Sequence, residues 1–291
     1  MKIGIIGAGK VGTTLGMYLR QRKDAMAEIV GFYSKNVETA KETAEFVGTD
    51  YFEKLEDLVA LSDTLFVTTP DGEIAKVWDC MRQLAAESKI DLNQKLICHF
   101  SGSLSSDVFV SIEHFGAIAC SLHPIYAFSN KFSAYKQFHK VNFTMEGNEK
   151  AVETMKTFFE SLGHGVCLLK KEDKAKYHGA MSMVSNHMLA LLQTAVDTLG
   201  QCGFTRKQAY ESLETIVTEN IKSGFRFGAV EALTGPIERN DVETVEKHLK
   251  VLEPQTAVIY KELAKVLISM SKEKNPKRDY ETMEKRIDNM K

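Results

Sequence analysis

Residues 2–12 read KIGIIGAGKVG, and this stretch decides the fold. The apolar run Lys2–Ile6 leads into a G-x-G-x-x-G pattern, which opens the helical stretch Val11–Arg22. A strand, a glycine turn and a helix in this order are the context in which the pattern indicates a dinucleotide-binding loop. The first glycine permits a tight turn, the second lets the backbone approach a pyrophosphate, and the third lets the helix pack on the sheet. The alternative is a glycine-rich turn that binds no ligand.

The alternation of apolar runs and helical stretches continues to residue 169, which predicts a mostly parallel sheet covered on both faces. The strand-like runs are Lys2–Ile6, Glu28–Tyr33, Thr64–Thr69, Lys95–His99, Ala117–Ser121, Asn142–Met145 and Gly165–Leu169. After Lys170 the strand signals stop, and the main helical stretches are Lys171–Gly200, Arg206–Lys222, Val242–Leu252 and Pro254–Ser271. The sequence therefore predicts an α/β chain with a Rossmann-type domain over 1–169 and an all-α domain over 170–291.

Composition excludes several classes of function. The formal net charge is −2 over 291 residues, which disfavours a general nucleic-acid binder because such proteins need a basic face. The chain has no apolar run of about 18 residues, so we expect no membrane span, and we expect no targeting segment before the first strand. The five cysteines are scattered without a C-x-x-C pair, so no metal site or disulfide framework is expected. We expect a cytoplasmic protein.

The end of the second strand predicts the cofactor. Enzymes specific for NAD place Asp or Glu about 20 residues beyond the glycines, where it bonds the ribose. Tyr33-Ser34-Lys35-Asn36 has no carboxylate there. Ser34 can donate a hydrogen bond and Lys35 supplies positive charge, which favours the 2′-phosphate of NADP(H) over NAD(H). The alternative is that Lys35 is merely solvated.

A second strand end completes the predicted cofactor site. Thr69 and Pro70 follow the run that starts at Thr64, and strand ends of this kind face the cofactor crevice. The alternative is a strand exit followed by a helix cap. The residues assigned to the cofactor are Gly7, Ala8, Gly9, Lys10, Val11, Gly12, Ser34, Lys35, Thr69 and Pro70.

Two further strand ends carry the candidate substrate-side groups. Ser101 and Ser103 follow the run that ends at His99, and their hydroxyl groups could hold a substrate oxygen. The alternative is a serine-rich helix cap. His123 precedes a proline, which favours an extended backbone and lets the imidazole point across the crevice. It could equally be an ordinary loop histidine.

The first helix of the second domain carries a polar stripe. His178, Ser182, Ser185 and Asn186 recur at spacings that place them on one helix face. No charged residue lies between Lys176 and Asp197, so we expect a buried helix whose polar stripe lines a cleft. The alternative is that neighbouring helices or a dimer partner satisfy the stripe.

A polar break, Thr234–Asp241, interrupts the later helices. It could bring Arg239 toward an anionic substrate, or it could be a simple loop that ends in a cap. Asn240 is the expected N-cap of the helix that follows, with Glu243 reaching back to it.

At these residues the chain resembles a known family over nearly its whole length. It is similar to the Rossmann-like oxidoreductases with a C-terminal helical domain of unknown function, which are related to coenzyme F420-dependent NADP oxidoreductases. The match lies in Gly7–Gly12, His99–Ser103, Leu122–Pro124, His178–Asn186 and Leu233–Asp241. The resemblance implies a helical domain like that of 6-phosphogluconate dehydrogenase and a homodimer formed through it. It implies neither a particular reaction nor the use of coenzyme F420.

Two better-known groups share single features with this chain. β-Hydroxyacid dehydrogenases use a lysine with an asparagine four residues later on this helix. Here Lys174 is followed at that spacing by His178, and Lys176 by Ala180, so the lysine mechanism is not transferred. Prephenate dehydrogenases carry a His-Pro segment that resembles His123-Pro124.

The sequence thus predicts an NADP-dependent oxidoreductase that moves hydride to or from a small polar or carboxylated substrate at the interdomain cleft. Ser101, His123 and His178 are the candidate catalytic residues, because histidine titrates near neutral pH and can exchange a proton. The candidate substrate-binding residues are Ser103, Ser182, Asn186 and Arg239. The rival hypothesis is an NADP(H)-binding sensor or assembly factor that turns nothing over.

Overall fold

The computed structural model describes residues 1–289. The chain forms two compact units, Met1–Ser185 and Asn186–Lys291. The first unit continues past the predicted boundary at residue 169 and includes the start of the first helix beyond it. The predicted second domain runs to Lys291, of which residues 290–291 lie outside the described part.

The first unit contains an eight-stranded sheet with the order β3-β2-β1-β4-β5-β6-β7-β8. All neighbouring strands are parallel except β6 and β7, which are antiparallel. The strands are β1 (Lys2–Ile6), β2 (Glu28–Tyr33), β3 (Asp50–Phe52), β4 (Thr64–Val67), β5 (Leu96–His99), β6 (Ile118–Pro124), β7 (Phe143–Gly147) and β8 (Val166–Leu168). This confirms the predicted α/β class and the mostly parallel sheet.

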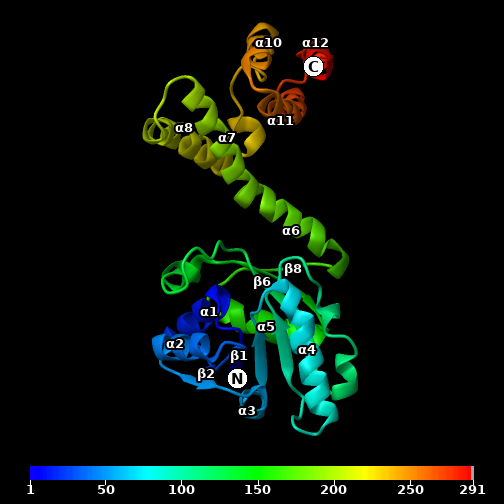
Figure 1. Cartoon of the computed structure of the whole chain (residues 1–291). Helices are drawn as coiled ribbons and strands as arrows, with labels where there is room; N and C mark the ends of the chain where they lie inside the picture. The colour runs from blue at the N-terminus through cyan, green and yellow to red at the C-terminus, as the bar shows by residue number, and fades with distance from the viewer. Residues whose placement is uncertain (290–291) are drawn as a thin grey trace. The chain divides into compact units, whose positions relative to one another are not determined.

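Helices cover both faces of this sheet (Figure 1). The covering helices are α1 (Lys10–Gln21), α2 (Val37–Val47), α3 (Leu55–Leu61), α4 (Asp71–Ala86) and α5 (Glu149–Ser161), and α6 (Lys174–Ser182) follows β8 without contributing to either core. Short 3-10 segments join them, namely η1 (Ser106–Val108), η2 (Ile112–Phe115), η3 (Ala134–Lys140) and η4 (Lys171–Asp173). Because both faces are covered, a strand such as β1 is a continuous apolar run rather than an alternating one.

Two apolar cores lie on opposite faces of the sheet. The first joins β1 and β2 to α1, α2 and α5, and it includes Ile5, Leu15 and Phe32. The second joins β4 and β5 to α3 and α4 and surrounds Trp78, which is 1% exposed. Together they hold the carboxyl ends of β1, β4, β5 and β6 at one edge of the sheet, where ligands of such folds bind.

The second unit is helical, as predicted. Its helices are α7 (Met188–Gln201), α8 (Arg206–Phe227), α9 (Ala229–Ala232), α10 (Val242–Val251), α11 (Pro254–Lys274) and α12 (Glu281–Asn289). A small core packs α10, α11 and α12 together around Val245, Ile268 and Met283. None of the helices in residues 1–289 combines the length and apolar character needed to cross a bilayer.

One local prediction was wrong. The N-cap of α10 is Asp241, whose carboxylate accepts a hydrogen bond from the Thr244 N–H at 3.1 Å. Asn240 instead takes a φ of +61°, a left-handed turn that asparagine tolerates. The predicted helical stretch Lys171–Gly200 is helical along its length, with a π turn at Met183–His187 between α6 and α7.

Candidate functional site

The glycine loop has the geometry that a pyrophosphate needs. Gly7 has a φ of +110°, and a Cβ on Gly12 would lie only 2.2 Å from the Gly7 carbonyl oxygen. Around the Cα of Gly9, by contrast, nothing lies within 4 Å of an added Cβ. Two glycines are therefore required by packing, and the third leaves open space at the N-terminus of α1. Lys10 and Val11 begin that helix, where N–H groups have no intrahelical acceptor.

A cavity of about 300 Å³ opens beside this loop. Its walls include Gly7, Ala8, Gly9, Ser34, Lys35, Thr69 and Pro70 from the predicted cofactor set. The hydroxyl of Thr69 is buried and has no hydrogen-bond partner. An orphaned hydroxyl, a glycine without neighbours and a free helix N-terminus together fit a bound dinucleotide.

A carboxylate lies beside Lys35 in this cavity, although the sequence has none at the end of β2. Lys35 is not merely solvated, because it forms an ion pair with Glu73 of α4. Glu73 also accepts a hydrogen bond from Lys76 at 2.6 Å. The two lysine partners lower the pKa of Glu73 to about 2, so the group is a carboxylate at any physiological pH. The end of β2 has no acid of its own, but α4 brings one to it.

The turn after β5 gathers two serines on one carboxylate. Ser101 and Ser103 donate hydrogen bonds from their hydroxyl groups to Asp71 Oδ2, at 2.8 and 2.9 Å. Asp71 directly follows Pro70 at the start of α4. Because Pro70 lines the dinucleotide cavity, this turn lies next to that cavity, as its position at the end of β5 predicts.

Lys174 is the most unusual side chain of this region. It is 2% exposed, and its Nζ donates to the Ser101 carbonyl oxygen at 3.0 Å and to the Ser121 hydroxyl. Burial lowers the pKa of Lys174 to about 8, although the carboxylates of Glu146 and Asp71 oppose the shift. An ammonium group has three N–H donors, so one remains beyond these two acceptors.

Three aromatic side chains complete the cluster. His123 Nδ1 lies 2.7 Å from the Tyr177 hydroxyl, and the rings of His123 and His178 are 6.1 Å apart. Both imidazoles lie beside Gly102, because a Cβ added to this glycine would lie 2.5 Å from His178 Cδ2 and 2.9 Å from His123 Nε2. Burial and the charge of Lys174 lower the pKa of His123 to about 4. His123 is therefore a neutral imidazole at pH 7.

The buried ring of His99 holds the turn after β5 in place through two hydrogen bonds. Its Nδ1 accepts a hydrogen bond from the Ser101 N–H at 3.2 Å, so its Nε2 must carry the proton that faces the Ser105 carbonyl oxygen at 3.1 Å. Burial lowers the pKa of His99 to about 4. This histidine holds the loop backbone in place as a neutral ring.

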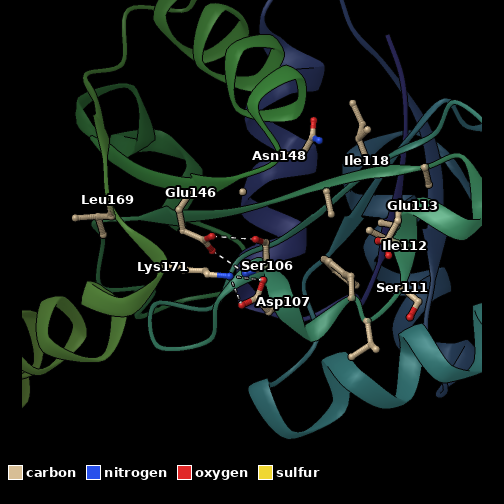
Figure 2. A pocket seen from close by; sticks show the side chains of 15 residues that line it. Ser106, Asp107, Ser111, Ile112, Glu113, Ile118, Glu146, Asn148, Leu169 and Lys171 are labelled. Carbon is tan, nitrogen blue, oxygen red and sulfur yellow. Dashed lines mark hydrogen bonds and ion pairs between the residues drawn. The ribbon is translucent and has the colours of Figure 1, made fainter.

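Hydrogen bonds also join the segment after β5 to β7 (Figure 2). Glu146 is 6% exposed and accepts hydrogen bonds from the Ser106 N–H at 2.7 Å and the Ser106 hydroxyl at 2.9 Å. Lys171 pairs with Asp107 at 2.9 Å. The four residues that make these contacts line a cavity of about 560 Å³. They tie the segment after β5 to the segment that leads into Lys174.

The remaining predicted residues are divided between the two units. Ser182 is half-buried near the end of α6, while Asn186 and Arg239 are exposed residues of the second unit. Met183, Val184 and Leu189 of this helix are each about two-thirds exposed in the single chain, so the burial of the helix against a partner or in a cleft stays a prediction. The π turn also holds more residues than an α-turn, which disturbs the spacing of the predicted stripe.

Sequence reasoning missed Lys174, Asp71, Tyr177 and Glu73 as site residues. Lys174 belongs to the basic run Lys170-Lys171-Glu172-Asp173-Lys174-Ala175-Lys176, in which nothing marks one lysine as buried. The lysine–asparagine pattern of the β-hydroxyacid dehydrogenases could not identify Lys174 either, because no asparagine lies four residues after it. The other three residues gain their importance only from contacts with distant segments.

Two family models match this chain. Residues 1–92 match an oxidoreductase family with an NAD-binding Rossmann fold. Residues 141–267, which begin just before β7, match a domain of unknown function, DUF2520. The predicted combination of a Rossmann oxidoreductase domain and a helical domain of unknown function is confirmed. No curated protein sequence matches this chain.

Crystal structures of three other proteins share the fold. TM1727 from Thermotoga maritima is 22% identical over 93% of this chain and 98% of its own, with a TM-score of 0.71. BF3122 from Bacteroides fragilis is 21% identical over 92% and 98%, with a TM-score of 0.68. The pyrroline carboxylate reductase of Plasmodium falciparum, solved with NADP bound, is 13% identical over 98% of both chains, with a TM-score of 0.52. At these identities the likeness is one of fold.

Proposed function

We propose that this chain, with its NAD-binding Rossmann domain, is an NADP(H)-dependent oxidoreductase that acts on a small polar or carboxylated substrate. One observation carries the proposal. A buried lysine, two histidines, a tyrosine and two serines converge around Gly102, directly beside the cavity that fits a dinucleotide. Perturbed titratable groups that gather beside a cofactor cavity are typical of an active site.

The cofactor would be held by the glycine loop and the N-terminus of α1, with Thr69 and Pro70 along its ribose. When bound, the nicotinamide supplies or accepts the hydride. Lys35 favours NADP(H) over NAD(H) because it offers positive charge to the 2′-phosphate. The Plasmodium falciparum reductase of the same fold, which binds NADP, supports this choice.

The substrate would lie against Gly102, within reach of Ser101, Ser103, His123 and His178. Because burial keeps His123 neutral, we assign to it the role of a hydrogen-bond donor in place of the proton exchange that the sequence predicts. If Tyr177 donates to Nδ1, the proton of His123 sits on Nε2, the atom next to Gly102. A neutral imidazole of this kind polarises a carbonyl or imine without transferring its proton.

Lys174 is the group whose pKa suits proton exchange. With a pKa of about 8, the ammonium can give up a proton to the reduced substrate and recover it from water near neutral pH. Its contacts with Ser101 and Ser121 fix Nζ beneath the turn that would hold the substrate. Asn186 and Arg239 remain candidates for binding the polar end of a substrate.

The test is a screen for NADPH oxidation with keto acids, imines and enolic acids, followed by Lys174→Met. The variant should lose about 10²- to 10⁴-fold in kcat and still bind NADPH. In the wild type, kcat for reduction should fall as pH rises through about 8, because only the protonated lysine donates. The reverse oxidation should rise through the same pH.

Lys176→Met is the matched control. Lys176 lies on the same helix with its side chain 86% exposed, so this variant should keep full activity. Cofactor binding without turnover of any substrate would favour the sensor hypothesis, and no affinity for either dinucleotide would refute the proposal.

A further inference from the structure

We propose that Lys76 is a second binding residue for the 2′-phosphate and that Glu73 sets the choice between NADP(H) and NAD(H). The inference rests on the proposed function. The predicted site contained only Lys35 as a charged group for the phosphate. The structure adds the cation Lys76 and the anion Glu73 from α4, which the sequence does not place at this site. Glu73 holds the two lysines together until a phosphate dianion replaces it.

The first argument is position. Lys35 follows β2 and Lys76 lies on α4, yet both side chains reach the same carboxylate, one at each oxygen. All three residues line the cavity that the glycine loop bounds, together with Ser34 and Thr39. Two ammonium groups that share one carboxylate are also close enough to share one phosphate, because both anions present oxygens that accept from lysine.

The second argument is charge. The three side chains carry two positive charges and one negative charge, since both lysines lower the pKa of Glu73 to about 2 and keep it ionised. A 2′-phosphate beside an ionised Glu73 would be repelled, so the carboxylate must turn away for the lysines to bind phosphate. A ribose hydroxyl has the opposite effect, because Glu73 can accept a hydrogen bond from it.

The third argument is freedom to move. The side chains of Lys35 and Lys76 are 73% and 65% exposed, and that of Glu73 is 31% exposed. Exposed ion pairs of this kind are weak, so exchange of one anion for another costs little. The three residues therefore form a phosphate site that is closed by its own carboxylate when no phosphate is present.

The experiment compares dissociation constants of NADPH and NADH for the full-length protein by isothermal titration calorimetry. Lys76→Ala should raise the Kd for NADPH about 10-fold, the usual size for loss of one charge-assisted bond, and change that for NADH less than about 2-fold. Glu73→Gln should lower the Kd for NADPH and raise that for NADH.

Asp79→Asn is the matched control, because Asp79 pairs with Arg82 three residues along on the same helix without lining the cavity. It should change neither constant. If Lys76→Ala weakens both dinucleotides equally, or Glu73→Gln leaves their ratio unchanged, this inference is wrong. If the wild type binds neither dinucleotide, the proposed function itself has failed.

Discussion

Burial controls the charge of the side chains around the turn that follows β5. His99 is fully buried with both ring nitrogens engaged, and Lys174 is 2% exposed with two neutral oxygen partners. In each case the loss of solvent disfavours the charged form and lowers the pKa. The result is a neutral histidine that shapes the loop and a lysine that is ready to exchange a proton.

The buried histidines should make the fold sensitive to mild acid. The pKa of His99 is about 4 in the folded chain and near its ordinary 6.5 when unfolded, so the unfolded chain binds the proton first as pH falls. Stability should therefore be complete above about pH 6.5 and be lost between 6.5 and 4, by on the order of 3 kcal/mol for this residue. Urea unfolding at a series of pH values measures the loss.

His99→Asn tests this assignment. Asparagine can still accept the Ser101 N–H bond through its amide oxygen, but it does not titrate. The stability of the variant should change less with pH over this window than that of the wild type. An unchanged pH dependence would mean that His99 is not the source.

At the scale of the element, the loop between β1 and α1 separates packing from binding. Gly12 is needed because an added Cβ would lie 2.2 Å from the Gly7 carbonyl oxygen, whereas a Cβ on Gly9 would enter open space. Gly12→Ala should therefore destabilise the fold by about 1–3 kcal/mol, the usual cost of overpacking, and abolish dinucleotide binding as well. Both effects can be measured by thermal unfolding and by titration with NADPH.

Gly9→Ala is the matched change in the same loop. It should leave the melting temperature within a degree or two, because nothing crowds the new methyl group, while the affinity for NADPH falls about 10-fold or more. Equal loss of stability in both variants would contradict the proposed division of roles.

Much of the sheet could be predicted because buried parallel strands leave a plain apolar signal. β1, β2, β4 and β5 appear in the sequence as such runs, and the glycine pattern places the cofactor edge. β3 was not predicted, because this strand of three residues at the sheet edge has no buried residue. Short exposed edge strands carry no hydrophobic period to detect.

The candidate site was less predictable than the fold. Ser101, Ser103 and His123 could be chosen because they follow strand ends that the sequence locates. The burial of Lys174 depends on Ser121 and Ser101, which are 53 and 73 residues away. The pairing of Lys35 with Glu73 likewise spans 38 residues, and no local pattern contains such contacts.

At the scale of the whole molecule, several large apolar side chains of the second unit are exposed in the single chain, which is typical of a surface that binds a partner. Of the 22 residues of α8, only Ala209 is buried, while Ile216, Phe225 and Phe227 are 58%, 89% and 58% exposed. Leu189 of α7 and Leu263 and Val266 of α11 are exposed as well. A second copy of the chain is the partner that the family resemblance implies.

We therefore expect a homodimer formed through the helical unit. Light scattering after size-exclusion chromatography should give about twice the chain mass of 32.6 kDa. Phe225→Asp should shift the protein to monomer, because a buried unpaired carboxylate is costly in an interface. Met26→Asp, at a residue of the first unit that is 88% exposed, should leave the dimer intact. A wild type that is monomeric at all concentrations would refute the expectation.

The contact of two imidazoles with Gly102 has a consequence for how this chain could evolve. A side chain at position 102 must move the ring at 123 or at 178 aside, so substitutions at the three positions are coupled. Homologues that keep both histidines should therefore favour glycine at position 102, and alanine there should be commoner in lineages that have lost one of the rings. The order of substitutions along a phylogeny would then record which of the two histidines became dispensable first.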